Sequence, residues 1–221
     1  MGSVSILLTG CGLASLQTAR TVPRGETQTT VAVSYLRNDQ PYFIIPPLPI
    51  DFMVRHGATD QIDFGGRVFL GLGILGDVKW NLLPRDRRTA LAVSVGAGGA
   101  AYPGSYKGTE VIHVPVGVTA SHAVTSWFTP YASIGYGAYW IFNYADRDPT
   151  MTYAARTGTG DGLLMAHLGI ELSRASGRAL LLEYTYARPV VDDPGDQFSF
   201  TTNHFFSIGF HSGDGPPLLS R

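Results

Sequence analysis

The chain has 221 residues, and only 15% of them are charged, against roughly 25% in a typical soluble domain. Its formal net charge is -1 and its 16 basic residues are scattered along the sequence, which excludes a nucleic-acid-binding face. No run of about 18 apolar residues occurs, so membrane-spanning helices are excluded, although a closed β-barrel can cross a bilayer without such runs. The composition does not change along the chain, which indicates a single domain.

Ten segments alternate apolar and polar residues with the period of a β-strand. Glycine, β-branched and aromatic residues fill these segments, and no capping box precedes any of them, so we expect essentially no helix. The expected strands are near 27–36, 50–57, 61–70, 73–83, 89–101, 110–121, 128–144, 162–174, 178–187 and 200–211.

The two faces of these strands differ in a way that indicates a membrane barrel. In the segment 128–144, one face carries Phe128, Ile134, Tyr136 and Trp140, whereas the other carries small and polar residues such as Thr129, Ser133, Gly135, Gly137 and Asn143. A soluble lipocalin-like barrel or a sandwich would place its large apolar residues inside instead. The pattern therefore favours a single closed antiparallel transmembrane β-barrel of about ten strands over soluble folds and over barrels of eight or twelve strands.

The connections between the expected strands alternate in length. Those at 57–60, 84–88, 122–126 and 174–177 are short, and those at 37–49, 102–109, 145–161 and 188–199 are longer. A three-residue hairpin loop at 71–73 is the one exception to this alternation. Short turns on one side and long loops on the other are typical of outer-membrane barrels, and an even strand count places both termini on the periplasmic side. We expect the barrel over 26–211 and a C-terminal tail over 212–221.

Charged residues on the polar faces are expected to point into the lumen. Unpaired charges in a narrow lumen are costly, so we expect them to pair and plug it, with Phe69, Tyr131 and Tyr139 filling further space. The expected charge network consists of Arg55, Asp63, Arg67, Asp77, Lys79, His167, Glu171 and Glu183. The prediction is a closed barrel with a structural or interaction role, and the alternative is a narrow channel or a small-ligand-binding or transport barrel.

Three local patterns that resemble functional motifs carry no function here. "GLGILG" at 71–76 fits a dinucleotide-binding pattern, but a strand rather than a helix follows it. "DDPGD" at 192–196 lacks the spacing of a calcium loop. A hydrolase would need Ser207, a histidine such as His204 or His211, and the Asp192 and Asp193 pair to converge. His204 and Ser207 differ in parity along one strand, so they face opposite sides. We therefore expect no enzyme, no cofactor and no metal, with an outer-membrane hydrolase as a third and more distant alternative.

The connection 37–49, "RNDQPYFIIPPLP", is unusually apolar for a loop. Its prolines prevent it from adding a strand to the sheet. It is the expected contact for an envelope protein partner, or a lid over the barrel mouth.

The stretch "RHGATDQIDFGGRVFLGLGILGDVKWNLL" at 55–83 resembles a run found in small, uncharacterised outer-membrane β-barrel proteins of Gram-negative bacteria. The resemblance extends over about 26–211 in strand pattern and turn placement. It implies an outer-membrane location, with membrane lipid as the surrounding partner, and it carries no catalytic residue across.

The only cysteine, Cys11, ends the sequence "LLTGC", which resembles the lipobox of bacterial lipoproteins. The resemblance implies cleavage before Cys11 and a diacylglycerol group on its sulfur. Residues 1–10 would then be a remnant of a signal segment, and 11–25 a tether to the barrel. The alternative is an incidental thiol, because residues 1–10 contain no Lys or Arg and only a short apolar core.

Overall fold

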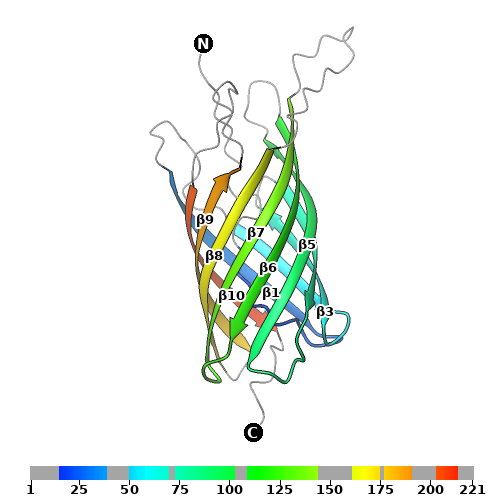
Figure 1. Cartoon of the computed structure of the whole chain (residues 1–221), viewed down its shortest axis with the longest axis vertical. Coiled ribbons are helices and arrows are strands. Elements are labelled where there is room, and N and C mark those ends of the chain that lie inside the picture. The colour runs from blue at the N-terminus through cyan, green and yellow to red at the C-terminus, as the bar shows by residue number, and fades with distance from the viewer. Residues whose placement is uncertain are drawn as a thin grey trace.

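The computed structural model describes residues 15–38, 50–69, 73–102, 109–143, 161–174, 177–190 and 203–213. The sheet closes into one antiparallel barrel of ten tilted strands (Figure 1), which confirms the predicted fold. The strands are β1 (Thr27–Asn38), β2 (Ile50–Gly57), β3 (Ile62–Phe69), β4 (Gly73–Asn81), β5 (Thr89–Tyr102), β6 (Thr109–His122), β7 (Phe128–Asn143), β8 (Asp161–Ser173), β9 (Arg178–Pro189) and β10 (Asn203–Gly213). No described helix is long and apolar enough to span a membrane.

Every strand pairs with its neighbours in sequence, and β1 closes the barrel against β10, with Val31 opposite Phe210. The predicted strand boundaries are right to within three residues. The largest shift is at β10, which begins at Asn203 rather than 200, and among the two-residue shifts β4 ends at Asn81 rather than 83. The early end of β4 has a local cause: the side chain of Asn81 accepts a hydrogen bond from the backbone N–H of Leu83 at 3.2 Å. This bond turns the backbone out of the ladder.

Large apolar side chains cover the outside of the barrel. Leu168 and Phe210 are each 63% exposed, and Ile134 is 57% exposed. The inward positions between them carry alanine, serine, threonine and the charged residues. This arrangement is the reverse of that in a soluble barrel, as the sequence pattern predicts.

The described short turns lie together at the lower end of the barrel in Figure 1. Two of them are built alike: the hydroxyl groups of Thr59 and Thr125 each accept a hydrogen bond from the backbone N–H three residues later, at Ile62 and Phe128. Most of each longer connection lies outside the described residues, including 39–49, and so do Cys11 and the tail from 214 onward.

Residues 15–24 require a correction to the predicted tether. They precede β1 and lie inside the barrel, where Leu16, Ala19 and Val22 are buried, and we call them the plug segment. The segment reaches the short-turn end at Arg24, which forms a parallel bridge with Gly57. A tether would leave its backbone in water, whereas this backbone bonds to side chains of the barrel wall.

Candidate functional site

The eight predicted lumen residues come from five strands, and most of them are buried. The period of two along β3 and β4 directs Asp63, Arg67 and Lys79 inward, and their exposures are 0%, 7% and 3%. Buried charges are stable only when other polar groups take the place of water. The partners of these side chains therefore define what the lumen can do.

Arg55 on β2 joins two carboxylates, one on β3 and one on β4. Its Nη1 lies 2.8 and 3.1 Å from the two carboxylate oxygens of Asp77, and its Nε lies 3.0 Å from Asp63. Its Nη2 also pairs with Asp63. The second oxygen of Asp63 lies 3.4 Å from Nζ of Lys79. Gly65 leaves room for this cluster, because a Cβ there would lie 2.9 Å from Cζ of Arg55.

Glu183 on β9 is the centre of a second cluster. Tyr131 and Thr185 each donate a hydroxyl hydrogen bond of 3.0 Å to its carboxylate. His167 Nδ1 lies 3.3 Å from the same carboxylate and 2.9 Å from the Thr185 hydroxyl. Glu183 is 4% exposed, so these donors replace the water that the carboxylate loses.

The plug segment begins on the Glu183 carboxylate. The backbone N–H groups of Ser15 and Leu16 each donate to it at 2.7 Å, and the Ser15 hydroxyl donates at 3.0 Å. The Leu16 side chain packs into an apolar cluster with residues of the inner wall, namely Ala32, Met53, Tyr131 and Leu181. The start of the segment is thus held by a charge and by apolar contact together.

The rest of the plug segment bonds to the Asp63 and Lys79 pair and to β6. The N–H of Val22 donates to Asp63 at 2.9 Å, and Lys79 Nζ donates to the carbonyl oxygens of Thr18 and Arg20 at 3.2 and 2.7 Å. The N–H of Ala19 donates to the hydroxyl of Ser121 at 3.2 Å.

Side-chain bonds also fix the plug segment to the short turns. Thr21 donates to the carbonyl of Asp60 at 2.8 Å, and Arg20 donates to the carbonyl of Arg87 at 2.9 Å.

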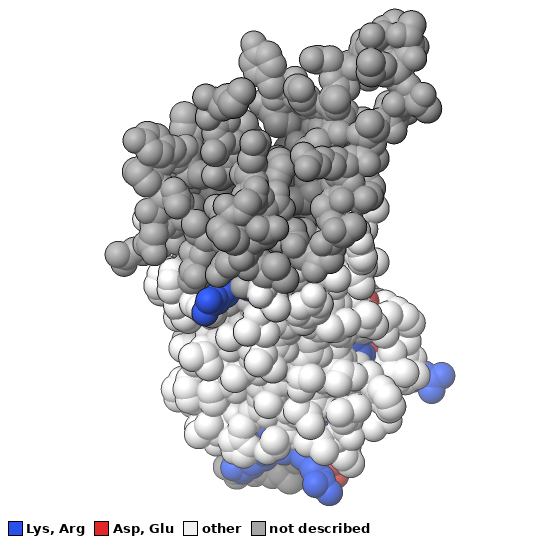
Figure 2. Space-filling model, turned by 45° about the horizontal axis from the view of Figure 1, so that its top comes forward, with Lys and Arg blue, Asp and Glu red and all other residues white. Residues whose placement is uncertain are grey.

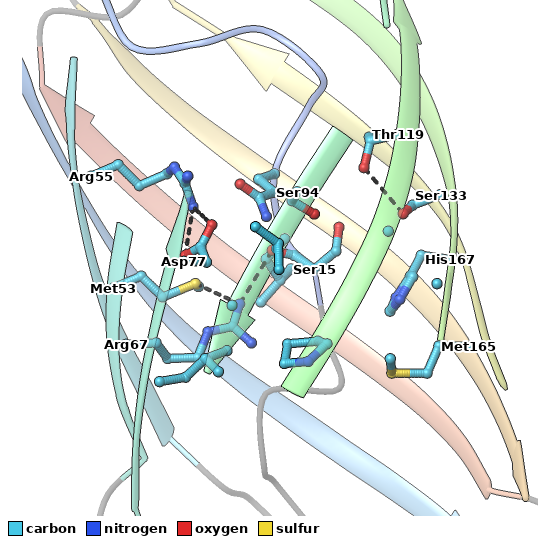
Figure 3. A pocket seen from close by; sticks show the side chains of 18 of the residues that line it. Ser15, Met53, Arg55, Arg67, Asp77, Ser94, Thr119, Ser133, Met165 and His167 are labelled. Carbon is cyan, nitrogen blue, oxygen red and sulfur yellow. Dashed lines mark hydrogen bonds and ion pairs between the residues drawn. The ribbon is translucent and has the colours of Figure 1, made fainter. Parts of the chain in front are cut away.

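Two predicted lumen residues lie apart from these clusters. Arg67 donates to the carbonyl of Ser15 at 3.2 Å and to the sulfur of Met53 at 2.7 Å (Figure 3). Its guanidinium lies 5.9 Å from the Phe69 ring centre. Glu171 is half-buried and accepts a hydrogen bond of 2.7 Å from Ser173. The lumen charges therefore form two clusters bridged by the plug segment, rather than one network of charge pairs.

Sequence reasoning missed the plug segment itself. Its sequence, "SLQTARTVPR", is polar and short, with apolar residues only at Leu16, Ala19 and Val22 besides Pro23. A spacing of three residues matches neither a strand nor an amphipathic helix, so no pattern in the chain predicts that these residues enter the barrel.

A cavity of about 90 Å³ remains beside the plug segment (Figure 3). It lies between Arg55, Asp77 and Arg67 on one side and Met165 and His167 on the other. One buried water needs roughly 10–15 Å³, and sites for drug-sized ligands measure about 300–1,000 Å³. The cavity suits a few water molecules. Among the described residues, no group of His, Cys, Asp and Glu could hold a metal ion.

The candidate hydrolase residues do not converge within the described part of the chain. Ser207 faces inward and its hydroxyl lies 2.8 Å from that of Ser34. His204 is on the other face of β10, with Nδ1 2.6 Å from the hydroxyl of Tyr184. His211 is buried inside the barrel, and Asp192 and Asp193 lie outside the described residues.

No protein-family model and no curated protein sequence matches the chain. Several solved membrane barrels are similar to it in structure. Neisserial surface protein A is 9% identical with a TM-score of 0.42, and the match covers 85% of this chain and 95% of that one. A transmembrane β-barrel designed de novo is 14% identical with a TM-score of 0.39, covering 88% and 98%. Ail, the attachment invasion locus protein of Yersinia pestis, is 10% identical with a TM-score of 0.36, covering 86% and 99%. No residue role is transferred from these proteins to this chain.

Proposed function

We propose that the chain is an integral β-barrel of the bacterial outer membrane whose lumen is closed by its own plug segment, with a structural or interaction role. The observation that carries the proposal is the set of bonds between the plug segment and the buried side chains of Asp63, Lys79 and Glu183. An open channel would keep these charges in water instead.

The outer surface supports the membrane location. Exposed apolar side chains occur on nine of the ten strands, among them Val31, Phe52, Phe64, Ile74, Val95, Ile112, Ile134, Leu168 and Phe210, and on β9 the outward Leu180 and Leu182 are half-buried. In a closed barrel every strand has neighbours on both sides, so its backbone polar groups are paired and lipid can surround it. Lipid is therefore the partner that fits this surface.

The plug segment supports the closed lumen on energetic grounds. If the segment left, the Glu183 carboxylate would lose three hydrogen bonds and the Lys79 ammonium would lose two. Hydrogen bonds to charged groups contribute about 1.5–3 kcal/mol each when water does not replace them. The segment and the wall therefore stabilise each other.

A role without catalysis is part of the proposal. The nucleophile candidate Ser207 and the base candidate His204 are on opposite faces of one strand, so they cannot exchange a proton. The lumen charges of Asp63, Lys79 and Glu183 instead hold the plug segment.

A narrow gated channel is the second candidate. Two observations favour it. The described contacts of the plug segment are all non-covalent, and the cavity of about 90 Å³ leaves part of the lumen beside the segment unfilled by protein. Withdrawal of the segment would join that cavity to the space the segment leaves.

Conductance across a planar bilayer tests both candidates. The purified wild type should give no steady current, and the double variant Lys79→Gln/Glu183→Gln should conduct if the segment can leave. Asp86→Asn is the control, because Asp86 is exposed in the turn between β4 and β5 and lies outside the lumen. A steady, ion-selective current in the wild type would overturn the closed barrel. Silence in the double variant, with folding checked by heat-modifiable migration on gels, would exclude the gated channel.

Lipidation of Cys11 and a periplasmic position for the short-turn end, where β1 begins and β10 ends, are further parts of the proposal, and they rest on the lipobox-like sequence and the even strand count. Full-length protein expressed in a Gram-negative host should incorporate labelled palmitate, and Cys11→Ala should abolish the label. Label that persists in the variant would show that Cys11 is not the attachment site.

A further inference from the structure

We propose that the short-turn end of the barrel binds the anionic headgroups of membrane phospholipids. The surface consists of five exposed arginines, which we call the basic collar: Arg24, Arg87, Arg88, Arg174 and Arg178. The inference rests on the proposed membrane location and adds a lipid preference to it.

The basic collar extends around several sectors of the rim. Arg24 precedes β1, Arg87 and Arg88 lie in the turn between β4 and β5, and Arg174 and Arg178 flank the turn between β8 and β9. These hairpins are separated by β6 and β7 on one side of the closed sheet. Figure 2 shows blue side chains at the lower edge of the described surface, with further blue side chains at its left and right.

Acidic side chains compensate only part of this charge. The exposed acidic residues of the described short turns are Asp60 and Asp86, two against the five arginines of the basic collar. Asp60 is itself 3.8 Å from Arg85, which does not belong to the collar. The described rim therefore keeps an excess of positive charge.

The depth of the basic collar indicates a lipid headgroup rather than a soluble acidic partner. Trp80 and Trp127, which are 50% and 57% exposed, lie at the same end of the barrel and mark the position where tryptophan meets the membrane interface. On β9, Arg178 continues the outward row of Leu180 and Leu182, so its guanidinium follows the lipid-facing side chains directly. The Arg178 guanidinium can therefore reach the phosphate of a lipid headgroup.

The opposite end of the barrel has the other sign of charge by sequence. The four longer connections, at 39–49, 103–108, 144–160 and 190–202, contain six aspartates, at 39, 146, 148, 192, 193 and 196, and three basic residues, at 107, 147 and 156. Anionic lipid is therefore expected to gather at the short-turn end alone. Arg188, which is exposed at the far end of β9, offers a matched control position.

The experiment titrates the detergent-solubilised, folded full chain with phosphatidylglycerol or phosphatidylcholine and counts bound lipid by native mass spectrometry. The wild type should prefer phosphatidylglycerol, and added salt should weaken the preference. Each arginine near an anionic surface contributes about a fivefold change in affinity. The variant Arg87→Gln/Arg88→Gln/Arg174→Gln/Arg178→Gln should thus lose at least about tenfold, whereas Arg188→Gln should bind like the wild type.

Equal binding of the two lipids by the wild type, or an unchanged preference in the fourfold variant, would overturn the inference. Soluble polyglutamate that binds through the same arginines without any lipid preference would also overturn it, in favour of an acidic polymer. Insertion into phosphatidylcholine vesicles, scored by heat-modifiable migration, separates this result from the proposed function. A barrel that inserts without a lipid preference contradicts only the headgroup site.

Discussion

The backbone N–H of Leu16 donates a 2.7 Å hydrogen bond to the carboxylate of Glu183, 167 positions further along the chain. The N–H of Ser15 donates to the other oxygen of the same carboxylate at 2.7 Å. A buried carboxylate is stable only with such donors, and a buried backbone segment outside the sheet needs such acceptors. One side chain of the wall therefore holds the start of the plug segment in the lumen.

Glu183→Gln should loosen the plug segment, because an amide accepts more weakly than a carboxylate and brings donors of its own. The test uses a single thiol at the buried position 18, introduced as Thr18→Cys in a Cys11→Ala background. We expect this thiol to react with a maleimide reagent at least about tenfold faster when Glu183→Gln is also present. Asp86→Asn, in an exposed short turn outside the lumen, should leave the rate unchanged. Equal rates in the presence and absence of Glu183→Gln would contradict the role given to this carboxylate.

Gly65→Ala should destabilise the barrel, since the added Cβ would overlap the Asp77 carboxylate and lie 2.9 Å from Cζ of Arg55. Overpacking of this kind costs about 1–3 kcal/mol in the free energy of unfolding. Gly66→Ala is the control one residue away, because its Cβ would meet no atom within 4 Å. Urea unfolding in detergent micelles measures both variants. A loss in Gly66→Ala that equals the loss in Gly65→Ala would argue against the Arg55 cluster.

Leu168→Arg tests the outer surface. Leu168 is 63% exposed near the middle of β8, where a charge facing lipid costs about 2–4 kcal/mol. Ser212→Arg places the same side chain on the outer face at the short-turn end of β10, where the cost falls to about 0–1 kcal/mol. Unfolding of both variants in phospholipid vesicles gives the difference. Equal stability would contradict a membrane around the middle of the barrel.

The fold was predictable because a period of two repeats through ten segments, with outward residues such as Leu168 and Phe210 that only lipid can cover. The strand ends were less predictable. β4 ends at Asn81, whose side chain accepts a hydrogen bond from the backbone N–H of Leu83. Such a bond cannot be predicted from the alternation of apolar and polar residues. Alternation decides which face a residue occupies, and local polar groups decide where the ladder stops.

The site was predictable only in part. Parity alone directs Asp63, Lys79 and Glu183 inward, because inward and outward positions alternate along each strand. Parity does not identify the partners across the lumen, since Leu16 and Glu183 meet only when the barrel has closed. The plug segment has no strand or helix periodicity that would place it inside the barrel. Its position is set by its hydrogen bonds to the lumen charges.

The most direct test of the plugged lumen is a disulfide between the segment and the wall. Ala19 N lies 3.2 Å from the hydroxyl of Ser121, so Ala19→Cys/Ser121→Cys in a Cys11→Ala background brings two thiols together. We expect this pair to oxidise to a cross-link in the folded barrel. Ala19→Cys/Ala120→Cys, with its second thiol on the outer face, should not form one. Free thiols at both 19 and 121 after oxidation of folded protein would contradict the presence of the plug segment in the lumen.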